Sequence, residues 1–129
     1  MIRLLICDDQ WIVCEGLEAI LDAEPDIEVV GITNDGAEAL ARIAELQPDV
    51  VLMDLKMPVM NGVQATQQIT LNFPKTKVLV LTTYGADEWV FDALRAGAVG
   101  YLLKGTPRAN LIAAVKGTAR GETHIDPKI

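Results

Sequence analysis

The sequence predicts an α/β protein in which five parallel strands form a doubly wound sheet with five helices on its two faces. Three observations support this fold class. Short apolar runs alternate with segments in which apolar residues recur at helical spacing. The stretches 4–7, 50–53 and 78–81 contain no polar residue, which is typical of strands buried on both faces of a parallel sheet. Each run is followed by polar residues, as expected where parallel strands end at one edge of the sheet.

The expected strands cover residues 3–7, 27–32, 50–53, 77–81 and 101–103. The run 50–53 is the clearest, because four apolar residues are followed by Asp54, and Pro58 then shows that the chain has left the strand. The Asn61-Gly62 pair marks the turn over the sheet edge. Taken alone, Asp54 could merely start that turn, since Asp is common there. The run 27–32 contains Glu28, so it is expected nearer the edge of the sheet.

The expected helices carry amphipathic patterns. The apolar positions of the first and second helices are Val13, Leu17, Ile20 and Leu21, and Ala37, Leu40, Ala41 and Ala44. The third helix, from Asn61 to about Asn72, has a weaker pattern. Those of the fourth, after Gly85, and of the fifth are Trp89, Val90, Phe91 and Leu94, and Leu111, Ile112, Val115 and Ala119. Asn61 is a typical N-cap, and Thr106-Pro107 resembles an N-cap followed by the first helical residue. After Gly121 the pattern ends. We therefore expect one domain over residues 1–121 and the start of a linker over residues 122–129.

Composition limits the function. The chain has 129 residues and a formal net charge of −7, so its surface repels nucleic acid phosphates and should not bind DNA by itself. No apolar stretch is long enough for a membrane span, and no signal-peptide pattern is present at the start. Cys7 and Cys14 are expected to be free buried thiols, in keeping with a cytoplasmic protein. His124 is the only histidine, which disfavours a histidine-based metal or nucleophile site.

The first polar residues after the strands are chemically unusual. Asp8, Asp9, Asp54, Thr82 and Lys104 should meet at one rim, because all carboxyl ends of a parallel sheet point the same way. Carboxylates about 4 Å apart repel one another by roughly 1 to 4 kcal/mol. A hard divalent cation removes that cost, and an all-oxygen ligand set favours Mg²⁺. The added lysine and hydroxyl suit a group with negative oxygens, such as phosphoryl.

Over nearly its whole length the sequence resembles the receiver domains of two-component response regulators. The resemblance is carried by Asp8-Asp9, Asp54, Met57-Pro58, Asn61-Gly62, Thr82, Tyr101 and Lys104, in the family's order. It implies a flavodoxin-like sheet with strand order 2-1-3-4-5. It also implies a signalling phosphoacceptor that assists its own phosphotransfer and dephosphorylation, and is otherwise not an enzyme.

The resemblance further implies the role of each residue. Asp54 would accept a phosphoryl group from a sensor histidine kinase. Asp9 and Asp54 would bind Mg²⁺ directly, the backbone carbonyl of Lys56 would complete the protein ligands, and Asp8 would act through water. Lys104 and Thr82 would then bind the phosphoryl oxygens. Tyr101 would swing inward as Thr82 moves, and so change the surface near the fourth helix and fifth strand.

Segments 93–98 and 100–104 and the tail 121–127 are similar to the NarL/FixJ-like subfamily, whose receivers precede a LuxR-type helix-turn-helix domain. The chain is therefore expected to control transcription and to contact DNA only through an output domain absent from residues 1–129. A homodimer is expected either through the face of the fourth helix, fifth strand and fifth helix, or through a face of the first and fifth helices. Lys56 and Tyr84 flank the site and are expected to influence how fast phosphate is lost from Asp54.

Three rival functions are each disfavoured by a feature of the sequence. A phosphatase of the haloacid-dehalogenase kind needs a second acid two residues after the nucleophile, where this chain has Lys56. A flavin or dinucleotide carrier needs a glycine-rich phosphate loop, which is missing after every expected strand. A degenerate receiver that only binds proteins is disfavoured, because all five rim residues are present.

Overall fold

The computed structural model describes residues 1–83 and 87–127. Within these residues, six parallel strands form one sheet in the order β2-β1-β3-β4-β5-β6. The elements are β1 (Ile2–Cys7), α1 (Trp11–Asp22), β2 (Ile27–Thr33), α2 (Gly36–Leu46), β3 (Val50–Met53), α3 (Gly62–Asn72), β4 (Lys77–Thr82), α4 (Asp87–Ala96), β5 (Gly100–Leu103), α5 (Arg108–Ala119) and β6 (His124–Ile125). The predicted doubly wound α/β fold is confirmed, and Gly85, expected before α4, lies outside the described residues.

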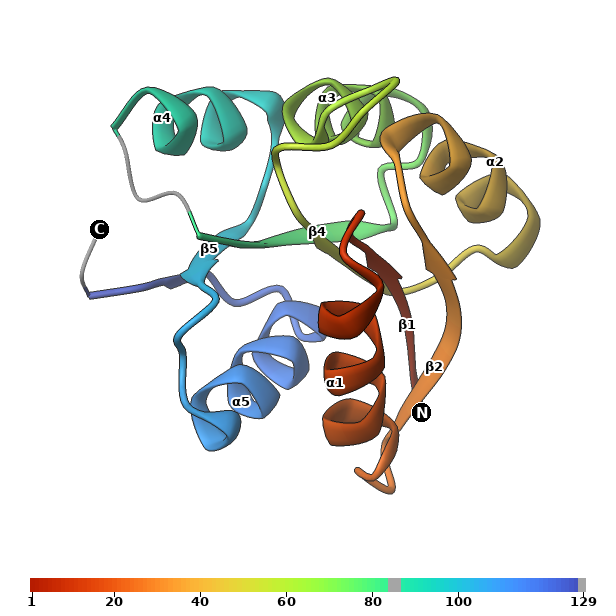
Figure 1. Ribbon diagram of the computed structural model, residues 1–129, viewed down its shortest axis with the longest axis vertical. Coiled ribbons are helices and arrows are strands. Elements are labelled where there is room, and N and C mark those ends of the chain that lie inside the picture. Colours follow the sequence, from red (N-terminus) through yellow and green to blue (C-terminus); the bar gives the residue numbers. More distant parts are fainter. Residues whose placement is uncertain (84–86, 128–129) are drawn as a thin grey trace.

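The helices form two layers around the sheet. Helices α2, α3 and α4 cover one face, and α1 and α5 cover the other (Figure 1). Alternate strand residues enter opposite layers, because successive side chains of a strand point to opposite faces. In β1, for example, Leu5 and Cys7 pack under α2 and α3, whereas Leu4 and Ile6 pack under α1 and α5. None of the described helices has both the length and the apolar character needed to cross a bilayer.

The central strand β3 fixes the position of the rim. Its four residues are buried, and Met53 pairs with Cys7 of β1 and with Val80 of β4. The backbone ladder continues one step further, since Asp54 N–H donates to the carbonyl of Cys7 at 3.0 Å. Asp8 N–H likewise donates to the carbonyl of Thr33 at 3.0 Å. The acids therefore leave neighbouring strands at the same level.

Of the two predicted helix caps, one is confirmed and one is wrong. Asn61 caps α3 through a reciprocal pair with Gln64, in which each side chain accepts from the other's backbone N–H. Gly62 then packs against the backbone of Asp54, where a Cβ would collide with the carbonyl oxygen. Thr106, in contrast, does not cap α5. Its hydroxyl instead bonds the carbonyl of Leu103 and the carboxylate of Asp126.

The predicted count of five strands is wrong, because the segment expected to begin a linker adds a sixth. In β6, His124 pairs with Gly100 and Ile125 with Tyr101. Gly100 allows this close approach, since a Cβ there would lie 2.7 Å from the carbonyl oxygen of His124. The outer edge of β5 needs partners for its backbone groups, and the returning chain supplies them.

Candidate functional site

Three carboxylates meet at the carboxyl ends of β1 and β3. One oxygen from each of Asp8, Asp9 and Asp54 lies within 4.8 Å of the other two. Asp8 and Asp54 are only 2% and 6% exposed, whereas Asp9 faces solvent. The loop geometry orients both buried acids: Gln10 N–H donates to Asp8 Oδ1 at 2.9 Å, and Leu55 N–H donates to Asp54 Oδ1 at 2.9 Å. The second oxygen of each is thus directed to other partners.

The lysine that follows β5 supplies the positive charge. Lys104 Nζ lies 2.8 Å from Asp8 Oδ2 and 3.3 Å from Asp54 Oδ2. It also donates to Gln10 Oε1 at 3.2 Å. The backbone of Lys104 is fixed to the neighbouring strand, because its N–H donates to the carbonyl of Thr82 at 2.8 Å. The topology therefore brings together the acids and the lysine, as the sequence predicted.

The electrostatics of this cluster follow from burial. Desolvation, and then the charge of Asp8, raise the pKa of Asp54 above its ordinary value, although Lys104 and Leu55 N–H partly oppose the shift. Burial alone would lower the pKa of Lys104, but hydrogen bonds and charges from Asp8 and Asp54 raise it. One buried ammonium thus compensates two buried carboxylates, and a third carboxylate adjoins them.

A cavity of about 300 Å³ opens at the cluster. It is lined by Asp9, Gln10, Asp54, Lys56, Thr83 and Lys104. The carboxylate oxygens of this site are hard ligands, and they outnumber the nearby cation, so the donor set fits Mg²⁺ with water completing its shell. No sequence pattern predicted that the side chain of Gln10 would reach Lys104.

The other two predicted site residues lie in the strands beside the cluster. Thr82, the last residue of β4, is buried. Tyr101 in β5 is also buried, and desolvation, followed by the charge of Asp54, raises its pKa to about 12. Tyr84, expected to flank the site, lies outside the described residues.

Comparison with known proteins agrees with this geometry. The family described as "Response regulator receiver domain" matches residues 4–116. The chain is 45% identical over 128 residues to the oxygen regulatory protein NreC of Staphylococcus carnosus, covering 98% of this chain and 59% of that protein. It is 43% identical to the transcriptional regulatory protein LiaR of Bacillus subtilis, covering 100% of this chain and 61% of that protein. The chain thus spans about three fifths of the length of these curated relatives.

Solved structures show the same fold. A two-component response regulator of the LuxR family from Aurantimonas sp. SI85-9A1 superposes with a TM-score of 0.94 at 31% identity, over 100% of this chain and 92% of that one. A signal receiver domain from Mycobacterium tuberculosis gives a TM-score of 0.90 at 35% identity, over 94% of this chain and 98% of that one. The fold and the acid–lysine rim agree with the family match over residues 4–116. The chain belongs to the response regulator receiver domain family.

Proposed function

We propose that Asp54 accepts a phosphoryl group from a sensor histidine kinase, and that the resulting charge switches the conformation of the domain. The observation that carries this proposal is the position of Lys104 Nζ, 3.3 Å from Asp54 Oδ2 at the wall of an open cavity. An ammonium at this distance can stabilise negative oxygens attached to Asp54. Neighbouring Asp8 and Asp9 supply the acids that a metal-assisted phosphoryl transfer needs.

The contacts of Asp54 suggest which oxygen reacts. Leu55 N–H holds Oδ1, so Oδ2, on the Lys104 side, is the one that attacks phosphorus. The new bond joins Oδ2 to phosphorus, the bond from phosphorus to the donor's imidazole nitrogen breaks, and that nitrogen keeps the electron pair. Lys104 then binds the transferred oxygens, and Thr82 donates its hydroxyl to one of them. Tyr101 turns further into the space next to Thr82.

The acid cluster would hold the metal. Asp9 and Asp54 offer direct ligands, Lys56 its backbone carbonyl, and Asp8 acts through water, as the receiver pattern implies. When bound, Mg²⁺ neutralises the charge that gathers on the phosphoryl oxygens. The chain's own residues supply orientation and charge, so it is a signalling phosphoacceptor with self-assisted phosphotransfer and dephosphorylation, and not a turnover enzyme.

The relatives suggest the output. NreC is named an oxygen regulatory protein and LiaR a transcriptional regulatory protein, and both are longer than this chain. We therefore propose a cytoplasmic transcription regulator whose DNA contacts are made by an output domain after a linker that begins in residues 122–129. Dimerisation would use either the α4–β5–α5 face or an α1–α5 face. Buried free thiols at Cys7 and Cys14 agree with a reducing compartment.

Incubation with phosphoramidate and Mg²⁺, followed by intact mass measurement, tests the proposal. We expect one phosphoryl group on the wild-type chain and none on Asp54→Asn. Steady phosphate release without an accumulating adduct would instead support a phosphatase. An unchanged mass of the wild-type chain would support an inert binding module.

A further inference from the structure

We propose that Asp126 is a positioning residue for Lys104, and that docking of the tail (residues 122–127) is coupled to phosphoryl binding at Asp54. This inference rests on the proposed function. Asp126 lies ten residues beyond the part of the chain that matches the receiver family, which ends at residue 116. Its role is suggested by its contacts in this structure, since the receiver family match does not extend to it.

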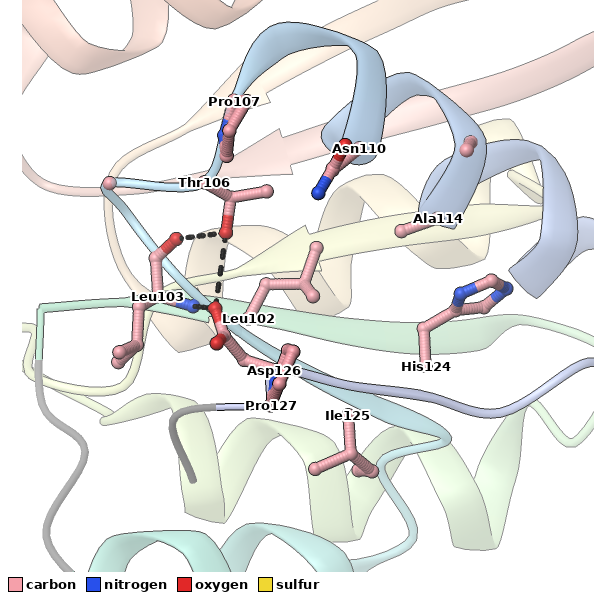
Figure 2. Close-up of a pocket in the computed structure, with 12 residues that line it drawn as sticks. Leu102, Leu103, Thr106, Pro107, Asn110, Ala114, His124, Ile125, Asp126 and Pro127 are labelled. Atoms are coloured by element: carbon pink, nitrogen blue, oxygen red, sulfur yellow. Dashed lines mark hydrogen bonds between the residues drawn. The ribbon is translucent and has the colours of Figure 1, made fainter.

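The carboxylate of Asp126 is buried against the turn between β5 and α5. It is only 8% exposed, and its Oδ2 accepts from Leu103 N–H and from Thr106 Oγ, each at 3.3 Å (Figure 2). Its own N–H donates to the carbonyl of Tyr101 at 2.8 Å. Burying a carboxylate is unfavourable unless such donors compensate it, so these contacts hold the carboxylate in one place.

These contacts fix both ends of the turn that carries Lys104. Leu103 N–H and the Thr106 hydroxyl converge on the same oxygen of Asp126, and the single hydrogen of that hydroxyl is shared with the carbonyl of Leu103, 2.7 Å from Thr106 Oγ. On the opposite side, Lys104 N–H is bonded to Thr82. The backbone of Lys104 is thus held between β4 and the tail. Small displacements at such a position strongly affect phosphoryl binding, because charge stabilisation depends on geometry.

The shared turn makes the coupling reciprocal. With the tail docked, Lys104 Nζ already points into the acid cluster, where phosphoryl oxygens would attract it further. Docking and phosphoryl binding therefore favour the same geometry of residues 103–106. By thermodynamic linkage, each must then strengthen the other by the same factor. Under the proposed function the output domain follows the tail, so this coupling would transmit the state of Asp54 to that domain.

The test compares Asp126→Ala with Glu122→Ala, a matched control that also removes one carboxylate from the tail. Glu122 pairs with Arg120 and His124, both outside the turn that carries Lys104. Beryllofluoride, a phosphoryl analogue, is titrated in Mg²⁺ buffer and followed by amide NMR. We expect Asp126→Ala to bind it about 5- to 10-fold more weakly, in the usual range of coupled sites. Glu122→Ala should stay within about twofold of wild type.

Two further measurements distinguish positioning from a general loss of structure. Mg²⁺ affinity should change by less than about twofold in Asp126→Ala, because the three acids lie outside β5 and the tail, whereas unfolding would weaken both ligands. Thr106→Val, which removes one donor but leaves the tail carboxylate, should give an intermediate loss. Beryllofluoride should also slow hydrogen exchange of Asp126 N–H in the wild type. The factor should equal the loss of beryllofluoride affinity that Asp126→Ala causes.

Equal beryllofluoride affinity in wild type and Asp126→Ala would overturn the coupling while leaving the proposed function intact. A parallel loss of Mg²⁺ affinity in Asp126→Ala would also overturn it, in favour of a structural role. If the wild type bound no beryllofluoride, the proposed function would fail, and this inference with it.

Discussion

Two lysines of this chain each bridge a pair of carboxylates, and the pairs differ in burial. Lys116 of α5 lies at the surface, with Nζ 3.0 Å from Glu24 Oε1 and 3.1 Å from Asp26 Oδ1. The hydrogen bond from Lys116 lowers the pKa of Asp26, so the carboxylate form of this acid is favoured. This ion cluster links α5 to the turn between α1 and β2.

The cluster around Lys104 also pairs one lysine with two carboxylates, but these carboxylates, of Asp8 and Asp54, are buried. Here burial raises the pKa of Asp54 even though the lysine lies 3.3 Å away. One lysine is thus enough for two acids that remain in contact with water, whereas two buried acids, with Asp9 adding a third anion, stay short of compensating interactions. The comparison shows why the rim, and not the surface cluster, can recruit a metal and a phosphoryl group.

The largest expected effect is that of Lys104→Met. Two buried carboxylates would lose their cation, so the free energy of unfolding should fall by about 3 kcal/mol at neutral pH without Mg²⁺. Urea denaturation measures this loss, and Mg²⁺ should restore part of it. An unchanged midpoint would mean that the acids are hydrated well enough without the lysine.

Addition of Mg²⁺ should stabilise the wild type by about 2.7 kcal/mol at a concentration 100-fold above its dissociation constant. Asp9→Asn should lose most of this gain, because the cluster would keep only two carboxylates. Glu24→Gln, in the surface cluster, should retain it. A gain that survived Asp9→Asn in thermal unfolding would place the metal elsewhere.

A smaller effect is expected for Asp54→Asn in metal-free buffer. An acid whose pKa is raised by folding stabilises the fold only at low pH, and that stability is lost as pH rises through the raised pKa. At pH 7 the variant should therefore be more stable than wild type by about 1 kcal/mol, the order of one carboxylate repulsion. As pH falls toward 3.8, the ordinary value of an aspartate, the difference should vanish. Urea midpoints across this pH range would show it, and a less stable variant at pH 7 would contradict it.

The smallest effect is expected for Lys116→Met. Exposed ion pairs contribute little, because water and salt screen them. The variant should unfold close to wild type, and the small difference should disappear in high salt. A loss as large as that of Lys104→Met would remove the distinction between the two clusters.

The sequence patterns predicted the strands, helices and acid–lysine rim well, because apolar periodicity and parallel topology determine them. They could not predict β6, since two residues are too few to show strand alternation. The Thr106 cap was also predicted wrongly, because its hydroxyl donates to the carbonyl of Leu103 at 2.7 Å and is shared with Asp126, twenty residues away. The contact between Gln10 and Lys104 likewise joins residues far apart in the chain. Such pairings depend on the finished fold.

Chemical trapping of the phosphorylated residue tests the central claim most directly. After reaction with phosphoramidate and Mg²⁺, borohydride reduces an aspartyl phosphate to homoserine, and peptide mapping by mass spectrometry locates it. We predict homoserine at position 54 alone, lost in Asp54→Asn and when Mg²⁺ is chelated. Homoserine at Asp8 or Asp9, or an unmodified Asp54 in the wild type, would contradict the account.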